Sequence, residues 1–202
     1  MDANKSKTVL ATLSFAVATA FAGSAFAQGA TQETGAYAGL AIGQSKTKDA
    51  CTGTSVPGVS TSCDDKDTAW RIFGGYQFMR YLGAEVAYTD FGKVKASGGG
   101  VTAEVKSNAW EVVAVGSYPI GTSGFAPYGK FGIFHGESKG SSNVGVSAKG
   151  SGESWTAGLG VRYDIVRNFA VRAEWQRYND VGGGDVGKAD VDVISIGALY
   201  KF

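Results

Sequence analysis

The stretch Trp70–Phe78 (WRIFGGYQF) decides the fold of this chain, because its side chains alternate with the two-residue period of a β-strand. One face of such a strand is almost entirely aromatic or aliphatic: Trp70, Ile72, Gly74, Tyr76 and Phe78. The other face includes the charged Arg71. After a short connection at Met79-Arg80, the segment Leu82–Thr89 alternates in the same way. We therefore expect these two segments to pair as an antiparallel hairpin.

Six further segments show the same alternation, near residues 35–44, 107–118, 127–137, 154–165, 169–178 and 190–202. The short connections fall at 79–80, 121–124 and 166–168. The long, polar connections fall at 45–67, 92–106, 138–153 and 179–189. Short turns at one end and long loops at the other are typical of an up-and-down barrel. The sequence therefore predicts an all-β fold, an eight-stranded antiparallel up-and-down transmembrane β-barrel.

The structural alternative is a soluble eight-stranded barrel of the lipocalin type, and the direction of the faces distinguishes the two. A soluble barrel turns its apolar side inward, whereas a membrane barrel turns it outward and keeps a polar interior. If the aromatic face points outward, seven charged residues fall on the inner face in mid-strand: Arg71, Glu85, Glu111, Lys130, Arg162, Arg172 and Glu174. Because such charges would not line a lipocalin-type ligand pocket, they favour the membrane barrel.

Aromatic residues are concentrated at the ends of the predicted strands. They are Trp70, Phe78, Tyr81, Tyr88, Trp110, Tyr118, Phe125, Trp155, Tyr163, Trp175, Tyr200 and Phe202. Aromatic rings at these positions suit the two membrane–water interfaces, where an apolar ring meets hydrated headgroups.

The seven inner charges need partners, because an unpaired charge in a narrow, partly dry interior is costly. The expected hairpins suggest three pairings: Glu111 with Lys130, Arg162 with the region of Arg172 and Glu174, and Glu85 with Arg71. Eight strands leave an interior just wide enough for side chains. We therefore predict a filled lumen, in which any conductance is small and comes from re-pairing of these charges.

The first 27 residues form a predicted secretory signal peptide. Lys5 and Lys7 precede an uncharged, apolar stretch over 9–26, which ends in the small-residue motif Ala25-Phe26-Ala27. Cleavage before Gln28 would leave a barrel domain over 28–202. A membrane anchor is the alternative for this stretch, and the cleavage motif disfavours it. No later stretch offers about 18 consecutive apolar residues, so no transmembrane helix is expected.

The composition narrows the possible functions. The 202 residues include 31 glycines and only 18% charged side chains, and the formal net charge is +1. A chain without a basic excess has no electrostatic footprint for nucleic acid, so no nucleic-acid partner is expected. Removal of the predicted signal peptide takes away Lys5, Lys7 and Asp2, which leaves a formally neutral chain.

Cys51 and Cys63 are the only cysteines and lie in one polar stretch rich in Gly, Ser and Thr. Because an exported protein matures in an oxidising compartment, we expect a disulfide between them. A metal site is the weaker alternative, because only two thiolates exist and the single histidine, His135, is far away in the sequence. We predict neither a metal nor a cofactor.

His135 is the only candidate for histidine-dependent catalysis. It follows Phe131 and Ile133 on the lipid-facing side of its strand, which favours a residue at the barrel rim. Glu137 and Ser138 are close in sequence, but adjacency alone does not build a catalytic site.

Two glycine runs resemble phosphate-binding loops only superficially. They are Gly98–Gly100 and Gly182–Gly184, and neither is followed by Lys-Ser/Thr or by a predicted helix. We interpret both as flexible loop tips.

The chain ends in Ser195–Phe202 (SIGALYKF), with a glycine followed by aromatic residues two apart at the terminus. Gly197, Tyr200 and Phe202 resemble the terminal signal that the barrel-assembly machinery reads in outer-membrane proteins. We therefore expect this machinery to be a partner during biogenesis.

Taken in order, several segments resemble the transmembrane domain of the OmpA-like family: Ile72–Phe78, Leu82–Glu85, Tyr88–Gly92, Tyr118–Ile120, Val161–Tyr163 and Arg172–Trp175. The resemblance implies a small eight-stranded outer-membrane β-barrel with a lumen closed by internal ion pairs, and Glu85 and Arg172 match the family's positions. Val115 stands where the family can carry Lys, and Arg162 where Glu is expected. The peptidoglycan-binding domain of longer members is not expected, because the chain stops at its last strand.

These observations predict a non-enzymatic, integral outer-membrane protein of a Gram-negative bacterium with a structural role and at most small ion permeation. The expected partners are outer-membrane lipids, lipopolysaccharide and the barrel-assembly machinery. The alternative is a surface adhesin that acts through its long extracellular loops. A lipid-modifying enzyme centred on His135 is a third, weaker hypothesis.

Overall fold

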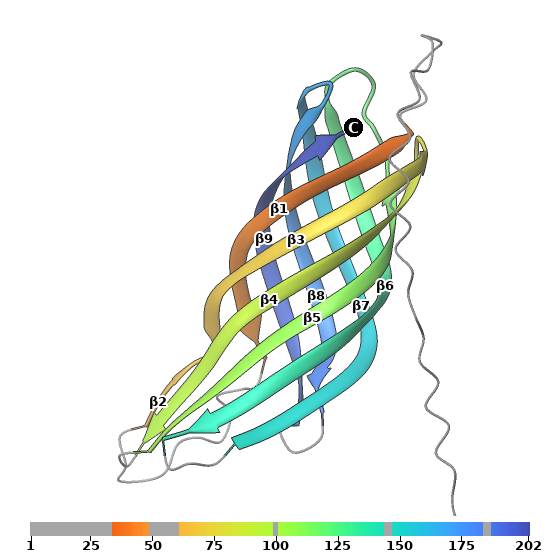
Figure 1. Ribbon diagram of the computed structural model, residues 1–202. Coiled ribbons are helices and arrows are strands. Elements are labelled where there is room, and N and C mark those ends of the chain that lie inside the picture. Colours follow the sequence, from red (N-terminus) through yellow and green to blue (C-terminus); the bar gives the residue numbers. More distant parts are fainter. Residues whose placement is uncertain (1–33, 49–60, 99–100, 144–146, 184–186) are drawn as a thin grey trace, which may run out of the picture. The chain divides into compact units, whose positions relative to one another are not determined.

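The computed structural model describes residues 34–48, 61–98, 101–143, 147–183 and 187–202. Eight long strands in this part of the chain form one antiparallel barrel (Figure 1). Their bounds are β1 Gly35–Thr47, β3 Lys66–Met79, β4 Leu82–Gly98, β5 Val101–Ser117, β6 Phe125–Ser142, β7 Ser147–Val166, β8 Phe169–Gly182 and β9 Lys188–Lys201. Each strand pairs with its neighbour in the chain, and β1 pairs with β9 to close the ring. The predicted eight-stranded barrel is confirmed.

The two ends of the barrel differ. At the turn end, brief connections join β3 to β4, β5 to β6 and β7 to β8. At the opposite end, which we call the extended end, the strands run well beyond the predicted segments. Much of the predicted loops 92–106 and 138–153 is therefore strand: β4 and β5 stay paired to Gly98↔Val101, and β6 and β7 to Ser141↔Ser147. In β6 and β7 these parts are rich in Gly and Ser and show little apolar alternation. In β4 and β5 a short alternation exists, at Val94 and Ala96 and at Val101, Ala103 and Val105, and the sequence analysis missed it.

A ninth, short strand, β2 (Thr61–Asp64), lies inside the predicted loop 45–67. It pairs antiparallel with the outer part of β4, from Thr61↔Gly98 to Asp64↔Lys95. The strand thus adds a fifth member to the sheet that β4, β5, β6 and β7 form at the extended end (Figure 1).

The two faces of the barrel wall point as the sequence predicts. On the outer face, Phe131 and Ile133 are 64% and 68% exposed, whereas on the inner face Glu85 is only 1% exposed. Eleven of the twelve predicted interface aromatics are exposed, and Tyr88 is half-buried. An exterior that is apolar and an interior that is charged is the arrangement of a membrane barrel. No helix in the described ranges is both long and apolar enough to cross a membrane.

Inward-facing glycines let large inner side chains fit into this narrow barrel. A Cβ atom on Gly39 would overlap the ring of Phe73, and one on Gly75 would overlap the ring of Tyr37. Gly160 makes the same room for the ring of a tyrosine on the adjacent strand β6. Part of the high glycine content is therefore explained by close approach of side chains rather than by turns.

Candidate functional site

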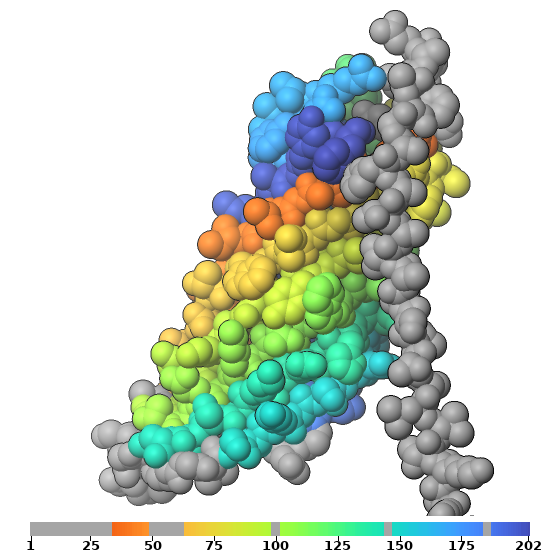
Figure 2. Space-filling model, viewed as in Figure 1, coloured from red at the N-terminus to blue at the C-terminus, as the bar shows by residue number. Residues whose placement is uncertain are grey.

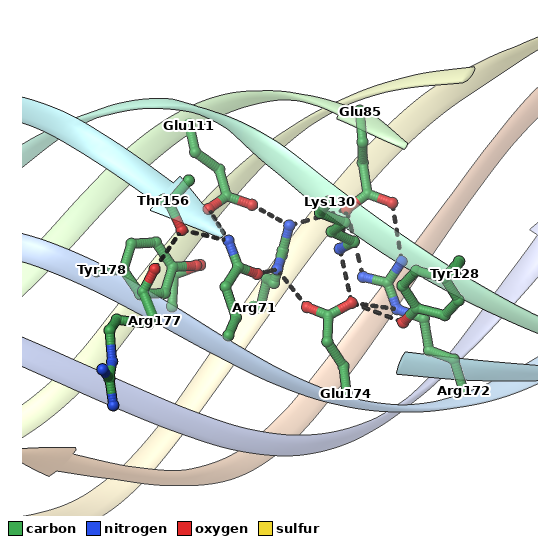
Figure 3. A network of polar contacts seen from close by, with 12 residues as sticks. Arg71, Glu85, Glu111, Tyr128, Lys130, Thr156, Arg172, Glu174, Arg177 and Tyr178 are labelled. Carbon is green, nitrogen blue, oxygen red and sulfur yellow. Dashed lines mark hydrogen bonds and ion pairs between the residues drawn. The ribbon is translucent and has the colours of Figure 1, made fainter. Parts of the chain in front are cut away.

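Six charged side chains occupy the middle of the lumen, and all are 6% exposed or less (Figure 3). Three are cations and three are carboxylates: Arg71, Lys130, Arg172, Glu85, Glu111 and Glu174. They come from five strands, β3, β4, β5, β6 and β8, because on each strand they share the parity that points inward. We call this set the lumen network.

Glu85 is the centre of the half of the network nearer the turn end. Its Oε1 atom lies 2.7 Å from Lys130 Nζ and 2.8 Å from Arg71 Nη2. Its Oε2 atom accepts a hydrogen bond of 2.8 Å from Arg172 Nη1. The hydroxyl of Tyr37 also donates to Oε2, at 3.3 Å. Three cations thus converge on one buried carboxylate.

Glu174 links the same cations from the opposite wall. Lys130 Nζ lies 2.7 Å from Glu174 Oε2, and Arg71 Nη1 lies 2.8 Å from Oε1. The hydroxyl of Tyr128 donates a 2.6 Å hydrogen bond to Oε2. The fully buried ammonium group of Lys130 therefore bridges two carboxylates, which offset the cost of removing its charge from water.

The half of the network nearer the extended end is organised around Glu111. This carboxylate forms an ion pair with Arg71 and accepts a 2.8 Å hydrogen bond from Gln176 Nε2. Gln176 Nε2 also lies 2.9 Å from Thr156 Oγ1, and its Oε1 accepts from Arg71 Nη1. Arg71 therefore contacts all three carboxylates and joins the two halves (Figure 3).

Apolar layers lie on both sides of the lumen network. Toward the turn end, Phe73 packs under the network, and the guanidinium carbon of Arg172 is 3.4 Å from its ring centroid. Toward the extended end, a buried cluster consists of Ala69, Phe91, Ala109, Phe134, Tyr178, Val181, Val191 and Val193. The rings of Phe91 and Phe134 both contact Tyr178 edge-on. The charges thus lie between two apolar layers, one around Phe73 and one around Tyr178.

The glycine run at 182–184 has a structural role that the sequence interpretation missed. Gly182 and Gly183 are buried, and they lie so close to β7 that a Cβ atom on Gly150 or Gly152 would overlap their backbone. Two described members of this run are therefore packed against the barrel wall rather than forming a loop tip. Gly99, Gly100 and Gly184 lie outside the described residues.

The pairings within the lumen differ from the expected ones. Glu111 is opposite Phe134 in register, four positions from Lys130, so the expected Glu111–Lys130 pair does not form. The expected proximity of Glu85 and Arg71 is observed. Among these ion pairs, only Arg71–Glu85 joins neighbouring strands. Most of the other pairs reach across the lumen, and local register does not reveal such contacts.

Arg162 is not part of the lumen network, although it is opposite Arg172 in register. Its Nε atom lies 3.1 Å from Asp164 Oδ1, and Asp164 Oδ2 lies 2.9 Å from Lys201 Nζ. These residues form a separate ionic cluster closer to the turn end. The sequence analysis missed Asp164 and Lys201, because both stand at strand ends.

Sequence reasoning also missed the uncharged members of the site: Tyr37, Tyr128, Thr156, Gln176 and Tyr178. Two of them could have been found from the sequence, because Gln176 and Tyr178 are at the next alternate positions after Arg172 and Glu174 and so face the lumen as well. Thr89 Oγ1 and the Tyr178 hydroxyl are 3.2 Å apart.

His135 lies on the outer face of β6, where its neighbours in register are Trp110 and Glu153. Its Nδ1 atom is 3.6 Å from Glu153 Oε1. Ser138 points to the opposite, inner face, where it hydrogen-bonds Ser107 at 2.8 Å. His135 and Ser138, which are close in the sequence, therefore point to opposite sides of the barrel wall and do not form a serine–histidine pair. Across the described ranges, no group of three or more His, Cys, Asp and Glu side chains is placed to hold a metal ion.

Several sequence predictions concern residues that the structure does not describe or that lie at the end of the chain. The predicted signal peptide, residues 1–27, and Cys51 lie outside it, so the cleavage site and the disulfide to Cys63 stay predictions. Gly197, Tyr200 and Phe202 lie at the end of the chain, where the last two rings are exposed and pack edge-on with centroids 5.2 Å apart. Their role as an assembly signal also stays a prediction.

Comparison with known proteins agrees with this architecture. The pattern of the OmpA-like transmembrane domain matches residues 31–202. Outer membrane protein A of Klebsiella aerogenes is 30% identical over 190 residues, which cover 93% of this chain and 54% of the relative. The chain thus spans about half the length of that relative.

Two solved structures show the same fold. Neisserial surface protein A has a TM-score of 0.59 and 17% identity, with 83% of this chain and 97% of that chain covered. Ail of Yersinia pestis, in complex with the heparin analogue sucrose octasulfate, has a TM-score of 0.51 and 19% identity, with coverage of 83% and 99%.

Proposed function

The chain belongs to the OmpA-like transmembrane domain family and is an integral β-barrel of the Gram-negative outer membrane, and from this premise we propose that it is a structural barrel with a sealed lumen. The observation that carries the proposal is the lumen network, in which three cations and three carboxylates form ion pairs with one another between two apolar layers. A structural role needs a rigid wall that does not leak, and buried ion pairs that cross the lumen supply both properties.

Ion permeation through such a lumen requires the network to rearrange. A hydrated ion meets side chains that already hold counter-charges at 2.7–2.8 Å. To pass, it must break some of these pairs, and each broken buried pair costs about 3–5 kcal/mol. We therefore expect rare, small openings rather than an open diffusion pore.

Planar-bilayer recording of the purified chain tests this proposal. We expect the wild type to show at most brief, small conductances. Glu85→Gln, which removes the carboxylate that three cations share, should raise the open time. Glu104→Gln is the matched control, because it makes the same change at a half-buried position outside the lumen. A large, stable conductance from the wild type would contradict the sealed lumen.

We further propose that the barrel is not an enzyme. The separation of His135 and Ser138 onto opposite faces of β6 supports this proposal. His135→Ala should leave lipid A composition unchanged in cells that express the protein, as judged by mass spectrometry of extracted lipid A. Loss of a lipid A modification in this variant, with the barrel still folded, would instead favour the enzyme hypothesis.

The proposed biogenesis partners can be tested at the chain's end. Gly197, Tyr200 and Phe202 are proposed to be read by the barrel-assembly machinery, and lipopolysaccharide is proposed as a lipid partner in the mature membrane. Deletion of Phe202 should lower the amount of folded barrel in the outer membrane. Folding of the same variant in detergent should be nearly normal, because Phe202 is 70% exposed.

The alternative function, a surface adhesin, is favoured by the length of β4–β7 at the extended end. These strands continue as a paired sheet with β2 beyond the apolar, outward-facing residues (Figure 1). Shortening the β6–β7 hairpin beyond Glu137 and Ser151 should leave the barrel folded. Loss of bacterial binding to host cells in that variant, with retained heat-modifiability, would favour recognition as the main role.

A further inference from the structure

Four lysines form a continuous row across the outer wall at the extended end. Lys93 of β4 is opposite Lys106 of β5, Lys106 is opposite Lys139 of β6, and Lys139 is opposite Lys149 of β7. All four side chains are exposed. Adjacent strands are about 4.8 Å apart, so the row extends over roughly 14 Å. We call it the lysine row.

A β-bulge brings the first lysine into this row. The register between β4 and β5 shifts between Asp90 and Lys93, and Gly92 has a φ of 77°. A positive φ of this kind is accessible to glycine at little cost. Without the extra residue at the bulge, Lys93 would point to the other face of the sheet.

Like charges directly opposite each other destabilise a sheet, so the row needs counter-charges. Some are present, because Lys93 Nζ lies 3.1 Å from Glu104 and Lys106 Nζ lies 3.3 Å from Asp90. Lys139 and Lys149, in contrast, form no ion pair with another described residue. The remaining charges near the row on this face are Lys95, 3.9 Å from Glu104, Asp64 of β2, which is opposite Lys95 in register, and Glu137, which like Asp90 is opposite Asn108. Five lysines therefore face four carboxylates.

The level of the row relative to the membrane points to the missing counter-charge. Trp110 and His135 are opposite each other at the rim of the apolar surface, and Lys106 and Lys139 follow four positions farther out. Four residues on a tilted strand correspond to roughly 10 Å along the membrane normal. Exposed aromatic residues mark the membrane–water interface, so the row stands in the layer just beyond it. Figure 2 shows that β4 to β7, from yellow-green to cyan, run side by side on this wall.

We propose that the lysine row binds phosphate groups of a phosphorylated glycolipid in the outer leaflet, the lipid A part of lipopolysaccharide. Ammonium groups form short, charge-assisted hydrogen bonds with phosphate oxygens. Lys139 and Lys149 are the main contacts, because their charges are not already paired. The proposal rests on the outer-membrane barrel of the proposed function and names a lipid site on it.

The neighbouring strands β1 and β3 provide a control pair of lysines. Lys46 of β1 and Lys66 of β3 are also opposite each other and exposed at the extended end. Next to Lys46 in register is Asp192 of β9, which forms a two-point ion pair with Arg177 at 2.7 and 2.9 Å. Strands β1 and β3 thus carry a lysine pair of similar exposure that is not part of the four-strand row.

The test uses the purified full chain in detergent, titrated with bisphosphorylated lipid A and read by native mass spectrometry. Lys139→Gln with Lys149→Gln should weaken binding at least about tenfold, because two charge-assisted contacts are lost. Lys139→Arg with Lys149→Arg should retain binding, since guanidinium also binds phosphate. Lys46→Gln with Lys66→Gln should change affinity by no more than about twofold, because β3 is three strands, or roughly 14 Å, from Lys139 on β6, and exposed charges that far apart are largely screened. Heat-modifiability on gels verifies that each variant is folded.

Three results would overturn the proposal. Equal binding by the Lys139/Lys149 glutamine variant and the wild type would remove the row as the site. Equal loss in both glutamine variants would show unspecific attraction to charge. Equal binding of dephosphorylated lipid A, or full displacement of lipid A by millimolar inorganic phosphate, would exclude the lipid phosphate as the preferred ligand. None of these results affects the conductance test of the sealed lumen, so the two proposals fail independently.

Discussion

The lumen network and the lysine row both depend on strand register, but they treat charge in opposite ways: the lumen pairs its lysine with carboxylates, and the outer wall places lysines next to one another. In the lumen, Lys130 lies 2.7 Å from each of two carboxylates and is removed from solvent. On the outer wall, Lys139 stands between Lys106 and Lys149 in register and is exposed. A low dielectric makes every unpaired charge expensive, whereas water and salt reduce the repulsion between neighbouring lysines.

This difference shows which charges hold the barrel together. Buried ion pairs must be complete, because removing one partner leaves the other charge buried with neither a counter-charge nor water. Exposed charges contribute little to stability and are free to be arranged for binding. The same residue type therefore has opposite effects in the two regions, and three substitutions measure that contrast.

The largest effect is expected for Glu85→Gln in the lumen network. The change leaves Lys130, Arg172 and Arg71 short of a shared carboxylate, and we expect the free energy of unfolding to fall by about 3–5 kcal/mol. Urea unfolding in phosphatidylcholine vesicles, followed by tryptophan fluorescence, measures it. Glu104→Gln, which loses only partly exposed pairs, should cost less than about 1 kcal/mol. Equal losses in the two variants would show that burial does not make an ion pair contribute more to the free energy of unfolding.

An intermediate effect is expected for Tyr128→Phe. This substitution removes a 2.6 Å hydrogen bond to Glu174 and keeps the ring that Gly160 accommodates. Hydrogen bonds to charged groups contribute about 1.5–3 kcal/mol, so unfolding should become easier by a similar amount. The control is Tyr118→Phe, at an outward position that is 66% exposed, for which we expect almost no change in the same urea assay. An unchanged stability of Tyr128→Phe would mean that Glu174 is satisfied by its cations alone.

The smallest effect, and one of opposite sign, is expected for Lys139→Gln in vesicles that contain only phosphatidylcholine. The substitution relieves repulsion from the lysines on both sides, so stability should rise by roughly 0.2–1 kcal/mol. In vesicles with bisphosphorylated lipid A the gain should disappear, because the wild type is then stabilised by its ligand. A loss of stability in phosphatidylcholine alone would show that the lysine row does not carry net repulsion.

The alternation of Trp70–Phe78 and of seven other segments was sufficient to predict the barrel, its eight long strands and the direction of its faces. Six of the seven predicted inner charges belong to the lumen network. Their partners could not be predicted, because contacts such as that of Arg71 with Glu174 join strands that are not neighbours. Arg162 was also misplaced: it points inward opposite Arg172 in register, but parity does not specify its partner, and it pairs with Asp164 instead.

The outer parts of the strands were harder to predict than the membrane-facing parts. Within the apolar belt, lipid requires every second residue to be apolar, and the sequence records that requirement directly. Beyond the belt the outward face contacts water, so the alternation is short in the ends of β4 and β5 and nearly absent in the Gly- and Ser-rich ends of β6 and β7. The lysine row depends on three registers and on the bulge at Gly92, none of which is visible in the chain read by itself.

The sequence by itself thus determined the fold class, the membrane-facing surface and which charges point inward, because each of these follows from local alternation. Only the tertiary structure decided which charges pair, where Gly182 and Gly183 pack and which lysines become neighbours. Those features depend on the closure of the ring and on the register of its strands, which join residues that are far apart along the chain.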